Sequence, residues 1–383
     1  MTMKKKRKVM VVTSSRADWS RCRTVCEELE KREDTELQLV VCGAHLSDLY
    51  GITVKDIEES QIPIVARLDT LGSRREDDSA SMAVQYTITS SRIEQQISKF
   101  KPDVVVAVTD RFEALATATV GALMNVHVAH IQGGEISGTI DESIRHATTK
   151  LSHLHFPATI EAENRIVRMG EDPAFVFNVG CPASDLIVRE QSIGVLDERF
   201  IEPGDEPYVL VLYHPVTTEY SEMKEKAEAV FEAVSLLDGV LPIILMPNHD
   251  AGHDLVRSTI LGLTYGANFQ MVLGWHFTHD KFSNMLKYAE CLIGNSSAGI
   301  REACYFGTPV VNIGTRQRGR YPRGEGVVDV EEEAGAIYKG IRDQIQHGKY
   351  KEGRLYGGGD AGKQIAEILA TIELPPIQKQ LME

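Results

Sequence analysis

Short runs of β-branched and apolar residues alternate along the whole chain with longer amphipathic stretches of helical period. This alternation is typical of parallel sheets with helices on both faces. In the first half of the chain it predicts strands at 8–14, 36–42, 62–66, 103–108, 126–131 and 175–179. The clearest helical stretches lie at 17–32, 79–100, 111–124, 141–152 and 159–170.

A second series of strands follows, at 208–213, 241–246, 269–273, 290–293 and 309–313. The polar segment 202–207, which contains Pro and Gly, separates the two series and has the composition of a linker. We therefore expect one α/β domain over 1–203 and another over 204–358, with a C-terminal helix in 359–383 that packs back toward the first domain. Ligands of such sheets bind at the carboxyl ends of the strands, so we expect a cleft between the domains.

Composition narrows the class of protein further. The 383 residues suit two domains, and 43% hydrophobic with 25% charged residues is ordinary for a globular chain. The net charge of −14 repels nucleic acid. No stretch approaches the roughly 18 apolar residues of a membrane span, and no signal peptide is recognisable, so we expect a cytoplasmic protein without a membrane partner.

The cysteines give no sign of a metal site or of disulfides. The six residues include no C-x-x-C pair and no His/Cys cluster at zinc-ligand spacing. We expect reduced, mostly buried thiols and no bound metal.

Two turns that follow predicted strands in the first domain combine cations with polar groups. In the turn 13–20, Arg16 and nearby hydroxyl groups can bind an anion, although helix capping by Ser15 or Asp18 explains the segment equally well. After the strand 103–108, Asp110 suits proton transfer, and Arg111 suits phosphate.

A third turn, 130–146, crowds titratable groups around three glycines. It contains Gln132, Glu135, Asp141 and Arg145. The glycines allow the backbone to pass close to a ligand, which favours a functional site. A structural salt bridge between Asp141 and Arg145, four positions apart on a helix, is the alternative interpretation.

The fourth turn, 293–302, opens a helix after a strand in the second domain. Ser296 and Ser297 there can form a nest for a diphosphate, and Glu302 can accept from ribose hydroxyls. His214 and Asn248 also follow strands and can join the same cleft.

With these residues collected, the chain resembles the hydrolysing UDP-N-acetylglucosamine 2-epimerases of sialic acid biosynthesis. It is similar to the bacterial enzymes and to the epimerase half of the animal bifunctional epimerase/kinase. The motifs that carry the resemblance are S-R-A-D-W-S at 15–20, G-A-H-L-S-D-L-Y-G at 43–51, D-R-F-E-A-L-A at 110–116, G-G-E-I-S-G-T-I-D-E-S-I-R-H at 133–146, H-P-V-T-T at 214–218, G-N-S-S-A-G-I-R-E at 294–302 and F-G-T-P-V-V-N-I-G-T-R-Q at 306–317.

The resemblance implies two Rossmann-like domains in the glycosyltransferase-B arrangement and no metal or redox cofactor. It implies elimination of UDP to a 2-acetamidoglucal, followed by addition of water to give N-acetylmannosamine. The implied substrate-binding residues are Arg16, Ser20, Arg111, Arg145, His214, Asn248, Ser296, Ser297, Glu302 and Arg316.

The chain departs from the family at one implied catalytic position. The family has carboxylates at Asp110, Gln132 and Asp141, but an amide does not titrate. Either Glu135 or the pair Asp110 and Asp141 then carries both proton transfers, or the substrate differs. A 2,4-diacetamido-2,4,6-trideoxyglucose linked to UDP or GDP is the alternative substrate.

Other functions remain open on the sequence alone. A non-hydrolysing epimerase and a glycosyltransferase share the expected architecture, and Gln132 is compatible with a non-catalytic nucleotide-sugar sensor. A homodimer or homotetramer is expected because symmetric assembly is common among such enzymes.

Overall fold

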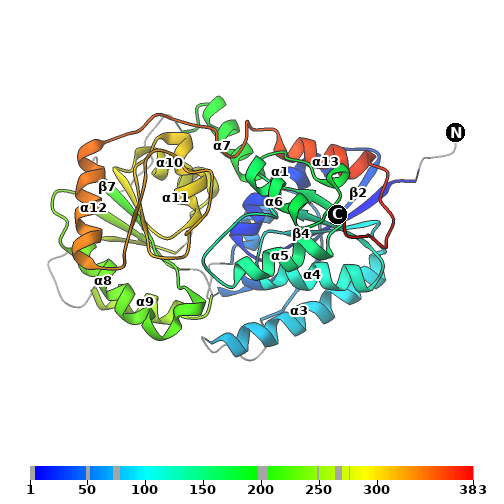
Figure 1. Cartoon of the computed structure of the whole chain (residues 1–383), viewed down its shortest axis with the longest axis horizontal. Helices are drawn as coiled ribbons and strands as arrows, with labels where there is room; N and C mark the ends of the chain where they lie inside the picture. The colour runs from blue at the N-terminus through cyan, green and yellow to red at the C-terminus, as the bar shows by residue number, and fades with distance from the viewer. Residues whose placement is uncertain are drawn as a thin grey trace.

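The chain folds into two α/β halves, each built on a six-stranded parallel sheet (Figure 1). The structure is a computed structural model that describes residues 5–48, 52–71, 78–196, 206–247, 250–263, 270–275 and 277–382. The two halves lie side by side, and α7 (Pro182–Ser192) lies near their junction (Figure 1).

The first half contains the sheet β3-β2-β1-β4-β5-β6. Its strands are β1 (Arg7–Thr13), β2 (Thr35–Cys42), β3 (Ile64–Leu68), β4 (Val104–Val108), β5 (His127–Ile131) and β6 (Leu154–Phe156). Its helices are α1 (Arg16–Glu30), α2 (Val54–Glu59), α3 (Ser79–Phe100), α4 (Phe112–Leu123), α5 (Asp141–Leu151) and α6 (Ile160–Arg168).

The second half contains the sheet β12-β11-β10-β7-β8-β9. Its strands are β7 (Tyr208–Leu212), β8 (Leu241–Leu245), β9 (Val272–Gly274), β10 (Cys291–Gly294), β11 (Val310–Ile313) and β12 (Val327–Val330). Its helices are α8 (Met223–Ser235), α9 (His253–Leu263), α10 (His279–Tyr288), α11 (Ser297–Arg301) and α12 (Ala334–His347).

Both sheets have the strand order of dinucleotide-binding folds, 3-2-1-4-5-6 when the strands of each half are counted along the chain. The order reverses between β1 and β4 in one sheet and between β7 and β10 in the other. A ligand crevice therefore opens beside the carboxyl ends of these four strands. The predicted α/β class with two Rossmann-like sheets in the glycosyltransferase-B arrangement is confirmed.

The structure differs from the predicted elements at one predicted strand and at two edge strands. The strand predicted at 175–179 is wrong, because Pro173–Phe175 forms a short 3₁₀ helix and Val176 makes only an isolated bridge to His155. The edge strands β6 and β12 were not predicted, since they are short and include His155 and Asp329. Of the linker predicted at 202–207, residues 202–205 lie outside the described residues.

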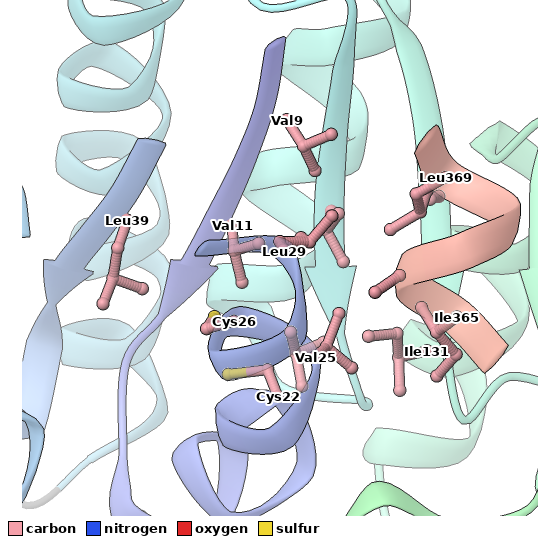
Figure 2. Close-up of a cluster of buried hydrophobic side chains, with 14 of the residues drawn as sticks. Val9, Val11, Cys22, Val25, Cys26, Leu29, Leu39, Ile131, Ile365 and Leu369 are labelled. Atoms are coloured by element: carbon pink, nitrogen blue, oxygen red, sulfur yellow. The ribbon is translucent and has the colours of Figure 1, made fainter. Parts of the chain in front are cut away.

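The core of the first half forms on both faces of its sheet. Val9 and Val11 of β1 face α1, whereas Met10 and Val12 face the side that α3 and α4 cover. Ile365 of α13 (Ala361–Thr371) joins the cluster on the α1 side (Figure 2). The C-terminal helix thus completes the core of the half in which the chain begins (Figure 1).

The predicted burial of the cysteines is confirmed, since all six are buried and none forms a disulfide. Within the described ranges, no helix is both long enough and apolar enough to span a membrane.

Asp185 of α7 ties the start of α13 to α1. Its carboxylate accepts hydrogen bonds from the backbone N–H groups of Ala361 and Gly362, at 3.0 and 2.7 Å, and from Thr24 Oγ1 at 3.1 Å. Asp360, which precedes α13, makes no capping bond with its side chain. Asp185 therefore satisfies the helix N-terminus that a local cap would otherwise satisfy.

We predict that Asp185→Ala lowers the free energy of unfolding by about 3 kcal/mol, because buried donors lose a charged acceptor. Urea unfolding followed by circular dichroism measures this change. Asp360→Ala is the matched control, with an expected loss below about 0.5 kcal/mol. Equal losses in the two variants would contradict the assignment.

Candidate active site

A cleft of about 720 Å³ lies between the two sheets and is lined by residues of both halves. It sits beside the carboxyl ends of β1, β4, β7 and β10, where the strand order reverses. Most residues predicted from the sequence line this cleft, namely Arg16, Ser20, Asp110, Arg111, Gln132, Asp141, His214, Ser296, Ser297, Glu302 and Arg316.

Three predicted site residues are not part of the cleft wall. Glu135 and Arg145 are buried behind it, with side chains about 1% exposed. Asn248 lies outside the described residues.

Positive φ angles occur at the ends of two adjacent strands. Thr109 after β4 and Gln132 after β5 both have φ of 65°. Hydrogen bonds hold these turns, since His130 Nε2 donates to the Thr109 carbonyl at 2.7 Å and the Gln132 N–H donates to the Phe156 carbonyl at 2.9 Å. Left-handed backbone at non-glycine residues often marks functional sites, and here it sets the direction of Asp110 and Gln132.

Arg145 holds Asp110 rather than Asp141. Its Nη2 donates to Asp110 Oδ2, and its Nη1 donates to the Glu135 carbonyl at 2.9 Å and to Glu142 Oε2 at 3.2 Å. The salt bridge between Asp141 and Arg145, considered as an alternative, is replaced by these pairs. Burial would raise the pKa of Asp110, but Arg145 and Arg320 outweigh it and hold that pKa far below its usual value.

Asp141 has the opposite environment at the first position of α5. Burial and the negative charges of Asp110 and Asp250 raise the pKa of Asp141 to about 6. Two carboxyl groups on one cleft wall thus have pKa values shifted in opposite directions. This separation is typical of paired acid and base groups in enzymes.

Both functional atoms of the Gln132 amide are bound by protein groups. Its Oε1 accepts from Arg301 Nη1, and its Nε2 donates to Cys181 Sγ. The amide therefore has a fixed orientation in the cleft wall, where it can orient a ligand but cannot exchange a proton.

Glu135 forms ion pairs with two arginines of the second half. Arg301 Nη2 donates to its Oε2, and Arg320 Nε lies 3.4 Å from the same oxygen. Burial would raise the pKa of Glu135, but these guanidinium groups outweigh it and lower the pKa. A buried, ionised and doubly paired carboxylate is poorly suited to exchange protons with a substrate in the cleft.

On the opposite side of the cleft, Asn295 joins the loops after β7 and β10. It accepts from the His214 backbone N–H at 2.7 Å and donates to the His214 carbonyl at 2.8 Å. Burial, together with Arg316 and Arg16, holds the pKa of His214 well below its usual value, so the imidazole is neutral. Gly294 has φ of 134°, and a Cβ there would lie 2.0 Å from the Leu212 carbonyl oxygen, so this turn requires glycine.

The helix cap predicted as an alternative for the first turn is present, since Ser15 Oγ accepts from the Asp18 N–H at 3.4 Å. Arg16 nevertheless lines the cleft and donates to the Trp275 carbonyl of the second half at 3.2 Å. The cap is therefore confirmed, whereas anion binding by Arg16 stays a prediction.

Sequence reasoning missed several charged residues of the site. Arg301 lies within a recognised motif, but nothing in its spacing indicates a partner in the other half. No sequence feature indicated a role for Arg320 or Asp250. In the structure, Asp250 Oδ1 accepts from Arg111 Nη1 at 2.7 Å across the cleft. In the described part of the chain, no group of three or more His, Cys, Asp or Glu side chains is arranged to hold a metal ion.

The chain is similar to known proteins over most of its length. The model of the UDP-N-acetylglucosamine 2-epimerase family matches residues 27–370. The chain is 34% identical over 378 residues to a hydrolysing UDP-N,N'-diacetylbacillosamine 2-epimerase of Legionella pneumophila, covering 98% of each chain. It is 33% identical over 372 residues to the UDP-N-acetylglucosamine 2-epimerase of Neisseria meningitidis serogroup B, covering 96% of each chain.

The fold is also that of solved structures. A UDP-N-acetylglucosamine 2-epimerase of Methanocaldococcus jannaschii, in complex with UDP-N-acetylglucosamine and UDP, superposes with a TM-score of 0.77. The match covers 94% of this chain and 99% of that chain at 20% identity, which shows a common fold. On the strength of the family match and of relatives aligned over nearly its whole length, the chain belongs to the UDP-N-acetylglucosamine 2-epimerase family of enzymes.

Proposed function

We propose that this protein is a hydrolysing 2-epimerase that converts UDP-N-acetylglucosamine and water to N-acetylmannosamine and UDP, for sugars of the sialic acid type. The observation that carries the proposal is the pair Asp110 and Asp141, whose pKa values are shifted apart on one wall of the cleft. The opposite wall bears Ser296, Ser297 and Arg316, which suit a diphosphate.

The proposed reaction has two steps. In the first, a base removes the proton from C2, a double bond forms between C1 and C2, and the C1–O bond breaks with its electron pair leaving on UDP. In the second, the oxygen of a water molecule adds to C1 and a proton adds to C2 from the other face. The site must therefore supply a base, a proton donor and a cation for the leaving group.

We assign the base to Asp141. A carboxylate with a pKa of about 6 is ionised at neutral pH and accepts a proton more readily than one with a strongly lowered pKa. Asp110, held ionised by Arg145, contributes the charge that raises the pKa of Asp141. As the other carboxyl group on this wall, it is the candidate for the proton transfer on the opposite face of the ring.

The nucleotide is assigned to the second half. Ser296 is the N-cap of α11 and Glu302 is its C-cap. We expect Ser296 to contact the diphosphate of UDP and Glu302 to contact the ribose hydroxyls. Arg316 Nη1 donates to the Asn295 carbonyl at 3.1 Å, which holds its guanidinium beside the proposed diphosphate position.

A second candidate substrate is UDP-N,N'-diacetylbacillosamine, the 2,4-diacetamido-2,4,6-trideoxyglucose considered above. The relative from Legionella pneumophila, which bears this substrate in its name, supports it. The two sugars share the acetamido group at C2 and the leaving group at C1, so the same proton transfers apply. They differ at C4 and C6.

The test is incubation of the purified protein with each nucleotide sugar, with products identified by phosphorus NMR and mass spectrometry. Free UDP with a 2-epimerised sugar from either substrate supports the proposal. A 2-epimer that still carries UDP would identify a non-hydrolysing enzyme. Binding of both sugars without turnover would identify a sensor.

We predict that Asp141→Asn and Asp110→Asn each lower kcat by at least about a hundredfold, because an amide cannot exchange the proton. Affinity for UDP, measured by calorimetry, stays within about threefold of the wild-type value, because the nucleotide binds the other half. Wild-type turnover in either variant would remove that residue from the mechanism.

The pH dependence follows from the assigned base. The pKa of Asp141 is about 6, so kcat/KM rises as pH increases through about 6 and the carboxyl group loses its proton. In Asp141→Asn the residual activity lacks this rise. A pH profile that keeps the rise in the variant would assign the titration to another group.

We further predict that Gln132→Glu gives a folded protein with activity equal to or above that of the wild type. A glutamate oxygen can accept from Arg301 as the amide oxygen does, and the new carboxylate shares that guanidinium with Glu135 while the weak bond to Cys181 Sγ is lost. Thermal unfolding verifies the fold and initial rates measure the activity. A folded variant without activity would show that the neutral amide is required.

A further inference from the structure

Lys226 lies between two loops of the cleft without lining the cleft itself. From the first turn of α8, its Nζ contacts Glu219 Oε2 at 2.6 Å, Glu222 Oε2 at 3.0 Å and Glu332 Oε2 at 3.1 Å. The side chains of Lys226 and Glu332 are 16% and 10% exposed, whereas that of Glu222 is 61% exposed. Water and salt therefore screen the ion pairs of Lys226 with Glu219 and Glu332 less than its ion pair with Glu222.

Each of these two carboxylates uses its second oxygen to hold a loop. Glu332 Oε1 accepts from the hydroxyl of Tyr213 at 2.8 Å, and Tyr213 immediately precedes His214. Glu219 Oε1 accepts from Thr315 Oγ1 at 2.6 Å. One ammonium group thus connects the loop after β7 with the loop after β11.

The loop after β11 is packed closely on this cluster. Gly314 has φ of 70°, and a Cβ there would lie 2.5 Å from the carboxyl carbon of Glu332. The next residues, Thr315 and Arg316, contact the first half, since the Gly138 N–H donates to the Arg316 carbonyl at 3.0 Å. A displacement of this loop therefore moves Arg316.

The charge balance makes Lys226 necessary to this arrangement. Three carboxylates surround one ammonium group, so its removal would leave three mutually repelling negative charges. Partial burial would lower the pKa of Lys226, but the carboxylates outweigh it and raise the pKa, so the group stays charged over the pH range of catalysis.

We propose that Lys226 is a positioning residue that, through Glu219 and Glu332, holds the loops of His214 and Arg316 at the spacing that the UDP group requires. The inference rests on the proposed function, because it takes UDP as the group bound between these loops. Lys226 touches neither substrate nor reacting atoms and acts through its carboxylate partners.

The test compares Lys226→Met, Lys226→Arg and Lys224→Met. We expect Lys226→Met to weaken UDP binding and to raise KM by about tenfold, with kcat changed less than about threefold, since the loops move but the carboxylates of the first half remain. Lys226→Arg keeps the charge and should restore most of the affinity. Lys224 is 70% exposed on the same helix, and Lys224→Met is the matched control without effect.

Two further variants keep the inference testable if Lys226→Met does not fold. Thr315→Val removes the hydrogen bond to Glu219 without changing charge and should raise KM by about threefold. The triple change Lys226→Met, Glu219→Gln and Glu332→Gln removes the repulsion while leaving acceptors for Thr315 and Tyr213, so it should recover affinity.

The outcomes separate this inference from the proposed function. Wild-type protein that does not bind UDP would overturn both. Wild-type binding of UDP, with folded Lys226→Met or Thr315→Val equal to Lys224→Met in KM and affinity, would overturn the positioning role alone.

Discussion

The buried ion pairs of Glu135 are the interaction on which the site depends. Glu135 belongs to the first half, and both of its guanidinium partners, Arg301 and Arg320, come from the second. Breaking such a pair leaves an uncompensated buried charge and costs several kcal/mol, so the halves are held with their strand ends facing each other. This arrangement forms the cleft, to which each half contributes one wall.

The same arginines set the proton chemistry. Arg320 lies 3.9 Å from Asp110 and, together with Arg145, lowers the pKa of Asp110 and keeps it ionised. The resulting negative charge, added to burial, raises the pKa of Asp141 toward neutrality. A network that joins the halves therefore also shifts the pKa values of the two carboxyl groups in opposite directions. A neutral amide at Gln132 is accommodated because Glu135 already neutralises Arg301.

The sequence pattern predicted the helices and strands whose formation depends on neighbouring residues in the chain. The helix predicted over 79–100 matches α3, and the apolar strand predicted at 103–108 matches β4. Both were visible because a helical period, or a run of apolar residues in a strand buried on both faces, appears in contiguous residues. The short edge strands β6 and β12 were missed, since a few residues carry little periodicity. The turns that carry Asp110, Asp141 and Ser296 were found because they follow strands.

The partners of those residues could not be found in the same way. Glu135 and Arg301 are 166 positions apart, and nothing in their local sequence specifies that they meet. Glu135, three residues after Gln132, was one of the alternatives for the proton transfers, yet the structure gives this residue two buried cationic partners. Protonation roles depend on burial and neighbouring charge, which only the assembled cleft provides.

The reaction that we propose for this cleft removes and replaces the proton at C2 of a UDP-linked 2-acetamido sugar. Proton NMR of the reaction in deuterated buffer tests it most directly, with either candidate nucleotide sugar as substrate. We expect release of UDP together with a 2-epimerised sugar that carries deuterium at C2. Release of UDP with the original proton retained at C2 would contradict it, because simple hydrolysis at C1 needs neither elimination nor the paired carboxyl groups.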